Sequence, residues 1–398
     1  MSLQSRSQLP IAIALAMTAA IGPFSLDAYL PAFPAMAADL GVGLDDISLS
    51  VSVYIFIMSL GQLVGGPLSD QLGRQKVVFV GLALFVIASL LIWQSERLET
   101  LLAFRALQAF GAGWALVAVP ALVRDRVQGV EAARLFSLIG LIMMAAPAVS
   151  PSIGGALLAI GGWTFIFLFL ALYALVVMTV LELIIFRPAR RGEGATAAAP
   201  GPRMSLFKRY AAVLTTYRAL PFLFWQAASF SVLMIFITHA SFIYQSHYGA
   251  SAHSFGLLFG ANVIIMLLAN FINRTQLERF GSRPILRTAT MVQALGIVAL
   301  IVITLFDGGL WLFLPAMMLT IGMGGAIAPN NQAAFIEYFG VNSGTAAALL
   351  GASQFGIAGI ASALSAQLPH AVLPILLAMA LCSAVSLAML ALSLREER

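Results

Sequence analysis

Four ionisable residues lie within long apolar runs of this chain: Asp27, Arg105, Glu182 and His239. Charged groups are costly inside a bilayer and are functional there by default. At a helical rise of about 1.5 Å per residue, Asp27 lies roughly 9 Å and Arg105 roughly 7–8 Å below the outer ends of their apolar runs. Burial favours the neutral form of a carboxyl group, whereas a nearby arginine favours the charged form. Asp27 and Arg105 are therefore predicted to couple proton movement, with a static ion pair as the alternative.

The other two ionisable residues, Glu182 and His239, are weaker candidates for a functional role. Glu182 lies within a turn of the inner end of its apolar run, which favours a side chain that extends to the membrane interface. For His239, an interfacial or hydrogen-bonded role and proton carriage both stay open. Aromatic and amide side chains in the apolar runs could either line a cavity or pack between helices. The candidate substrate contacts are Asp27, Tyr29, Tyr54, Phe236, His239 and Asn262.

Several functional classes are excluded by missing motifs. An ATP-driven pump needs a phosphate-binding loop with a glycine before its lysine, and neither of the two lysines, Lys76 and Lys208, follows a glycine. The single cysteine, Cys382, excludes a disulfide framework or a cysteine-rich metal site. The histidines form no ligand pattern with nearby acids. We expect no catalytic residues, no metal site and no cofactor, so the chain is not predicted to be an enzyme.

The elements that position these residues must be membrane helices. Of 398 residues, 61% are hydrophobic and only 9% are charged, against roughly 25% charged in soluble proteins. A spanning helix needs about 20 mostly apolar residues, and twelve such runs occur. They cover 10–33, 47–66, 77–94, 100–121, 136–159, 163–186, 221–245, 254–273, 285–306, 310–332, 343–366 and 370–394. The first is predicted to be a retained span and not a cleaved signal.

The positions of the basic residues predict an orientation. With the N-terminus in the cytoplasm, all but two of the 21 Lys and Arg residues fall on the cytoplasmic side; the exceptions are Arg97 and Arg105. Cytoplasmic loops carry the excess of basic residues in membrane proteins. We therefore expect a multi-pass protein of the cell inner membrane with both termini cytoplasmic. The net charge of +5 is explained by this bias and does not indicate nucleic-acid binding.

The chain divides into two halves around one long polar stretch. We predict a six-helix bundle at 1–186, a cytoplasmic linker at 187–219 and a second six-helix bundle at 220–398. A short internal repeat supports this division, because aligning Asp70 with Glu278 also aligns Gly73 with Gly281. Two such halves suit a transporter that rocks about a central site.

The segment from Gly66 to Lys76 carries the most specific motif. It reads Gly-Pro-Leu-Ser-Asp-Gln-Leu-Gly-Arg-Gln-Lys and resembles the G-x-x-x-D-x-x-G-R-x-[KR] loop signature of the major facilitator superfamily. The resemblance implies an all-α fold of twelve transmembrane helices. It also implies that the segment latches one conformation, through Gly66, Asp70, Gly73 and Arg74. An ordinary charged turn is the alternative.

Two further segments resemble motifs of proton-coupled drug exporters. The run from Arg105 to Gly111 is similar to the buried-arginine motif of the superfamily. The run from Ser150 to Gly155 is similar to the antiporter motif, through Pro151, Gly154 and Gly155. It departs from that motif where other glycines are expected, at Ser137, Ala146 and Ser150, but these residues are small enough for close helix packing.

The segment from Ser25 to Pro34 resembles the first span of the bicyclomycin/chloramphenicol resistance (Bcr/CflA) group of drug:proton antiporters. This resemblance implies proton-coupled efflux of small amphipathic drugs, such as chloramphenicol-like antibiotics, by alternating access. Its partners would be a small-molecule substrate, protons and the lipid bilayer, with the protein acting as a monomer and binding no nucleic acid. Transport of a metabolite such as a nucleoside or a sugar is the alternative.

Overall fold

The computed structural model describes residues 3–126, 129–190, 206–339, 343–369 and 371–396. Within these ranges the chain is helical and contains no strand. Eleven described segments are long and apolar enough to cross a membrane, and Ala145–Gly161 is a shorter apolar helical stretch. The prediction of an all-α, multi-pass membrane protein is confirmed.

The helices of the first part of the chain follow the predicted spans. They are α1 (Leu3–Asp27), η1 (Leu30–Ala32), α2 (Phe33–Leu40), α3 (Leu44–Leu72), α4 (Arg74–Trp93), α5 (Leu98–Arg124), α6 (Gly129–Gly161), α7 (Thr164–Leu181), η2 (Glu182–Phe186) and α8 (Arg187–Arg190).

The later helices do the same. They are α9 (Leu206–Leu214), η3 (Tyr217–Ala219), α10 (Leu220–Ser241), η4 (Phe242–His247), α11 (Ala252–Phe280), α12 (Ser282–Leu305), α13 (Leu310–Gly322), α14 (Gly324–Ile336), α15 (Ser343–Ser365) and α16 (Val372–Glu396).

Several helices extend past both ends of the apolar runs that predicted them. The run at 47–66, for example, lies inside α3, which continues to Leu72. Hydropathy marks only the part of a helix that suits hydrocarbon, whereas the helix itself continues until the backbone conformation changes. Here the change comes at Gly73, whose φ of 93° is one that residues with a side chain rarely adopt.

The chain divides into two compact units. Unit 1 comprises Met1–Val42 and Ile57–Arg203, and unit 2 comprises Gly43–Phe56 and Met204–Arg398. The sequence-based halves at 1–186 and 220–398 stay a prediction, since Gly43–Phe56 groups with unit 2. Within the predicted linker at 187–219, residues 191–205 lie outside the described part of the chain.

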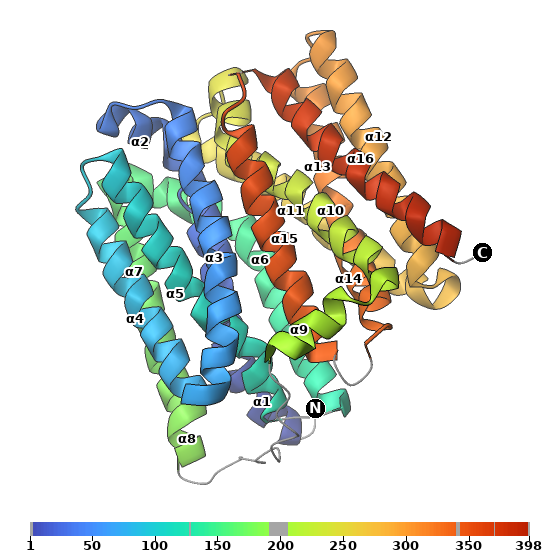
Figure 1. Ribbon diagram of the computed structural model, residues 1–398. Helices are drawn as coiled ribbons and strands as arrows, with labels where there is room; N and C mark the ends of the chain where they lie inside the picture. Colours follow the sequence, from blue (N-terminus) through green and yellow to red (C-terminus); the bar gives the residue numbers. More distant parts are fainter. Residues whose placement is uncertain (1–2, 127–128, 191–205, 340–342, 370, 397–398) are drawn as a thin grey trace. The chain divides into compact units, whose positions relative to one another are not determined.

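Close backbone packing holds α4 and α5 together in unit 1. The two helices run side by side (Figure 1), and α7 also packs against α4. A Cβ atom added to Gly81 would lie 2.7 Å from the carbonyl oxygen of Gly111. Such glycines allow helices in lipid to approach closely, and they bring Ser89 of α4 towards Gln108 of α5.

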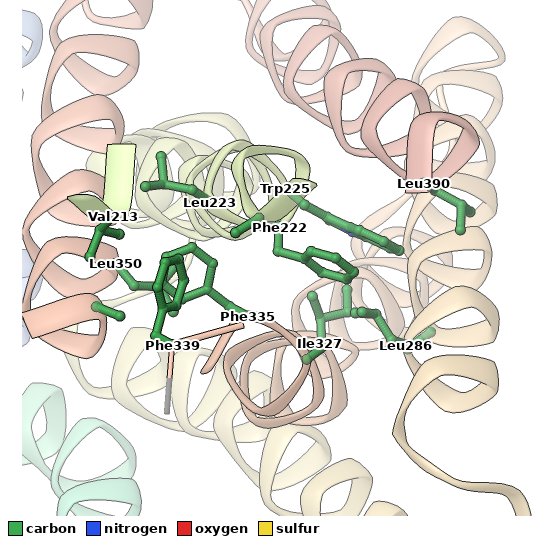
Figure 2. Packing of buried hydrophobic residues seen from close by; sticks show 14 of the residues in the cluster. Val213, Phe222, Leu223, Trp225, Leu286, Ile327, Phe335, Phe339, Leu350 and Leu390 are labelled. Carbon is green, nitrogen blue, oxygen red and sulfur yellow. The ribbon is translucent and has the colours of Figure 1, made fainter. Parts of the chain in front are cut away.

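Unit 2 has an apolar cluster near the start of α10. Figure 2 shows Phe222 and Trp225 of α10 beside Leu286 of α12 and Ile327 of α14. The rings of Phe222 and Trp225 are stacked with their centroids 6.1 Å apart. The indole N–H of Trp225 donates to Thr290 Oγ1 at 3.0 Å, so the buried ring leaves no unpaired donor.

Candidate functional site

Asp27 is the last residue of α1 and is almost completely buried, at 3% exposure. Pro31 has no backbone N–H to donate to the carbonyl oxygen of Asp27, and the chain continues through a turn into the short helix η1. Among the described residues, Asp27 Oδ1 has no hydrogen-bond partner. A buried carboxyl oxygen without a partner is rare in proteins and calls for a functional explanation.

Arg105 of α5 meets the same end of α1. Its guanidinium is fully buried and donates to the backbone oxygen of Ser25 at 3.1 Å, with Ser25 Oγ 3.4 Å away. It also donates to Gln108 Oε1 at 2.5 Å. A cation near the last carbonyls of a helix is favourable because that end carries partial negative charge. Arg105 therefore caps α1 two residues before Asp27.

Aromatic rings cover the guanidinium. Arg105 Cζ lies 4.4 Å from the centre of the Tyr29 ring and 5.8 Å from that of Phe167 in α7. The two rings lie 5.7 Å apart and are inclined at 60° to each other. Cation–π contacts of this kind stabilise a desolvated cation, so Tyr29 contributes to holding Arg105 in place.

A chain of hydrogen bonds extends from Arg105 to α4. Gln108 Nε2 donates to Ser89 Oγ at 2.6 Å, and Ser89 donates to the backbone oxygen of Phe85 at 2.7 Å. Sequence reasoning quoted Ser25 and Gln108 within its motifs but gave neither a role, and it missed Ser89. The spacing of Gln108, three residues after Arg105 on one helix, was the available signal.

The structure brings Asp27 and Arg105 to the same helix end without pairing them directly. The described residues show no ion pair between the two, because the guanidinium bonds to Ser25 and Gln108. The static ion pair considered from the sequence is therefore absent from this conformation. A role for both residues in proton coupling stays a prediction.

The antiporter-like segment of α6 packs on the residue that follows Asp27. Gly154 is buried against the backbone oxygen of Ala28 and leaves no space for a Cβ atom. Pro151 is buried one turn earlier, and Gly155 is partly buried. The motif therefore supports the backbone that carries Asp27, although its role in antiport stays a prediction.

The remaining predicted substrate contacts belong to unit 2. Phe236 of α10 packs between Tyr244 and Phe259, with ring centres 6.0 and 5.8 Å away. Asn262 donates to the Tyr244 hydroxyl at 3.0 Å, whereas its Oδ1 lacks a partner in the described part of the chain.

Two further predicted contacts are also buried in unit 2. His239 Nε2 lies 3.1 Å from Ser365 Oγ of α15, which favours the hydrogen-bonded reading of this residue. Tyr54 is fully buried on α3. Whether any of these side chains binds substrate stays a prediction.

The predicted latch segment forms the turn between α3 and α4. Gly73 has φ 93° and ψ 146°, and Gly281, its counterpart in the repeat, has φ 75° and ψ 170°. Each precedes the first residue of a helix, so the repeated sequence forms the same kind of turn in both units. Gly66 is partly buried against Val117 of α5. The side chain of Asp70 lies outside the described residues.

Arg74 joins this turn to the end of α5. Its Nε donates to Asp125 Oδ2 at 3.3 Å, and its Nη1 donates to Ser69 Oγ at 3.2 Å. The next residue, Gln75, donates to Glu182 Oε2 at 3.1 Å, so Glu182 has a hydrogen-bond partner. Its interfacial position stays a prediction. Sequence reasoning missed Asp125, although this acid lies directly between Arg124 and Arg126 in the sequence.

Comparison with known proteins decides the family. The model of the Major Facilitator Superfamily matches residues 15–363. The chain belongs to this superfamily. A bicyclomycin resistance protein homolog of Haemophilus influenzae is 27% identical over 385 residues, covering 96% of each protein. A chloramphenicol resistance protein of Pseudomonas aeruginosa is 29% identical, covering 78% of this chain and 73% of the relative.

The fold agrees with that membership. The crystal structure of a D-xylose-proton symporter matches with a TM-score of 0.74 and 12% identity, covering 96% of this chain and 97% of the symporter. At 12% identity the match shows only that the two folds are alike. Major facilitator proteins are membrane transporters of small molecules, so the chain is a transporter and not an enzyme.

The geometry of Arg105 leads to the first prediction for this major facilitator protein. We expect Arg105→Lys to lower transport at least about tenfold, because an ammonium cannot contact Ser25, Gln108 and the Tyr29 ring at once. Transport into proteoliposomes measures this, with the melting temperature as a check on folding. Transport close to that of wild type would show that charge alone suffices at this position.

Packing at Gly154 leads to the second prediction. Gly154→Ala should displace α6 from Ala28 at a cost of about 1–3 kcal/mol, as for other overpacked sites, and should reduce transport. Gly22→Ala on α1 is the matched control, since its Cβ would lie 4.0 Å from Met58 Sδ, an ordinary contact. Equal transport and equal melting temperatures for the two variants would contradict the proposed packing constraint.

The Arg74–Asp125 pair leads to the third prediction. Because both side chains are partly exposed, at 26% and 42%, the pair contributes at most about 1 kcal/mol to stability. We expect Asp125→Asn to leave the melting temperature nearly unchanged but to slow turnover several-fold, if the segment acts as a latch. Substrate binding measured on the same preparation should change little. Unchanged turnover would exclude a latch role for this pair.

Proposed function

We propose that this protein is a proton-coupled exporter of small amphipathic drugs, including chloramphenicol-like antibiotics. The proposal combines the superfamily membership with the names of similar proteins, which include a bicyclomycin resistance protein homolog, a chloramphenicol resistance protein and a multidrug resistance protein. The observation that carries the proton coupling is Asp27, a buried carboxyl group with an unpartnered oxygen beside a buried arginine.

Asp27 is suited to exchange a proton during a transport cycle. Its Oδ1 has no donor among the described residues, so the site stabilises no charge there through a hydrogen bond. Arg105 lies at the same helix end but is committed to the backbone of Ser25 and to Gln108. Small shifts of α1 relative to α5 would change the distance between Asp27 and the guanidinium, and with it the proton affinity of the carboxyl group.

Substrate contacts are proposed at the aromatic and amide side chains. Tyr29 would contribute in unit 1, and Tyr54, Phe236, His239 and Asn262 in unit 2. The unpartnered Oδ1 of Asn262 can accept a hydrogen bond from a hydroxyl or amide group. The neighbouring Phe236 and Tyr244 rings supply an apolar surface. This combination suits neutral or cationic amphipathic molecules.

We also propose that the protein acts as a monomer in the cell inner membrane with both termini in the cytoplasm. The distribution of basic residues supports this orientation, since all but two of the 21 fall on one side of the predicted spans.

The test is proton release and transport in purified Asp27→Asn protein. We expect the variant to lose drug transport driven by an imposed pH gradient, because an amide of nearly the same shape carries no exchangeable proton of this kind. Asp307→Asn is the matched control. Asp307 is exposed and has φ 52°, a conformation that asparagine adopts readily, so this variant should transport at the wild-type level.

Two results would contradict the proposal. Drug-induced proton release at the wild-type level in Asp27→Asn protein would remove Asp27 from the coupling mechanism. Accumulation of a nucleoside or sugar, without drug transport by the wild-type protein, would replace drug export by metabolite transport.

A further inference from the structure

Three amide side chains of unit 2 form a hydrogen-bonded series, here called the amide network. Asn331 Nδ2 of α14 donates to Gln226 Oε1 of α10 at 3.0 Å. Gln226 Nε2 in turn donates to Gln354 Oε1 of α15 at 2.9 Å. Asn331 and Gln226 are buried, whereas Gln354 is partly exposed. The amide network therefore runs from the interior of unit 2 to its surface.

A backbone carbonyl group fixes the direction of each bond in the amide network. Asn331 Nδ2 also donates to the backbone oxygen of Phe222 at 2.8 Å. Because a carbonyl oxygen can only accept, Asn331 must turn its NH₂ group towards it, and the same group then meets Gln226. Gln226 must present its oxygen to Asn331, which leaves its own NH₂ group for Gln354. Gln354 therefore presents its oxygen to Gln226 and keeps its NH₂ group free.

The interior end of the amide network shows that this direction is enforced. Asn331 Oδ1 is buried and has no partner among the described residues. Rotating the Asn331 amide would turn this oxygen towards two other acceptors, the Phe222 oxygen and Gln226 Oε1, and would leave the NH₂ group unpaired. The observed direction is thus the better of the two, and the surface end of the amide network is a donor.

That donor lies deep within a membrane span. Gln354 is near the middle of the span Thr345–Ser365. Its Nε2 has no acceptor in the described part of the chain. Lipid tails offer no acceptor at this depth, and polar side chains within membrane helices face the bundle interior or a cavity, where they mark the path of a substrate. The Gln354 NH₂ group therefore requires an acceptor from water or from a bound molecule.

An aromatic pair lies beside the same donor. Phe355 directly follows Gln354 in α15, and Phe230 follows Gln226 by about one turn in α10. The two rings lie 5.0 Å apart at an interplanar angle of 80°, an edge-to-face contact, and both residues are partly exposed. A further ring can pack on such a pair. The surface here combines an N–H donor with an aromatic face.

We propose that Gln354 selects substrates that carry a hydrogen-bond acceptor, such as a carbonyl or nitro oxygen, close to an aromatic ring. The Gln354 NH₂ group donates to the acceptor, and the Phe230 and Phe355 rings pack on the aromatic ring. This inference rests on the proposed drug export and adds a specificity-determining residue to it. A site that donates a hydrogen bond discriminates against molecules without an acceptor, because its donor is then left unpaired.

The test is equilibrium binding of two aromatic probes to the purified full-length protein. Chloramphenicol carries nitro and carbonyl oxygens, whereas tetraphenylphosphonium carries rings but no hydrogen-bond acceptor. We expect Gln354→Met, which keeps an unbranched side chain but removes the donor, to lower the affinity for chloramphenicol about tenfold. The affinity for tetraphenylphosphonium should be unchanged, and the melting temperature checks folding.

Two control variants separate the donor from the bond that holds it. Gln226→Met breaks the same Gln226–Gln354 hydrogen bond but keeps the Gln354 NH₂ group, so it should weaken chloramphenicol binding much less than Gln354→Met does. Gln367→Met changes an exposed glutamine just beyond α15, outside the amide network, and should bind both probes as the wild-type protein does.

Three results would overturn the proposal. The first is an unchanged affinity for chloramphenicol in Gln354→Met protein. The second is an equal loss of chloramphenicol binding in Gln354→Met and Gln226→Met, which would assign the effect to the broken bond; both results leave drug export intact. The third is a wild-type protein that binds neither probe, which would contradict the drug-export proposal and this inference with it.

Discussion

The buried guanidinium of Arg105 is the constraint on which the organisation of unit 1 depends. A charge removed from water must be compensated by hydrogen bonds and by nearby partial charges. Here the compensation comes from the carbonyl end of α1, from Gln108 and from the Tyr29 ring. Since these groups belong to different segments, satisfying one cation fixes how α1 and α5 meet. The carboxyl group of Asp27 occupies the end of the helix that this contact caps.

Close packing of helix backbones fixes the positions of the segments around the same site. Gly154 leaves no space between α6 and Ala28, and Gly81 brings α4 and α5 into backbone contact. Membrane helices gain little from hydrophobic burial against each other, because lipid is equally apolar, and van der Waals packing between small residues takes its place. Gly154 of the antiporter-like segment thus contacts the backbone directly after Asp27.

The internal repeat illustrates how local sequence and backbone conformation correspond. Gly73 and Gly281 were aligned from a short and unspecific match, yet both adopt positive φ values directly before a helix. The ion pairs beside the two turns also correspond. In unit 1, Arg74 pairs with Asp125, the C-cap residue of α5, and in unit 2, Arg283 pairs with Glu337, the C-cap residue of α14.

The sequence by itself determined the fold class, the approximate spans and the ionisable residues placed within them. These follow from hydropathy and from the cost of burying charge, which depend on residues along a single helix. Only the tertiary structure decided the partners. Arg105 bonds to a residue 80 positions away and Arg74 to one 51 positions away. Such contacts depend on the rotation and depth of one helix relative to another, which the apolar pattern of either helix leaves free. For this reason the depth estimate brought Asp27 and Arg105 to one level, but it did not reveal that the arginine bonds to the backbone beside the acid.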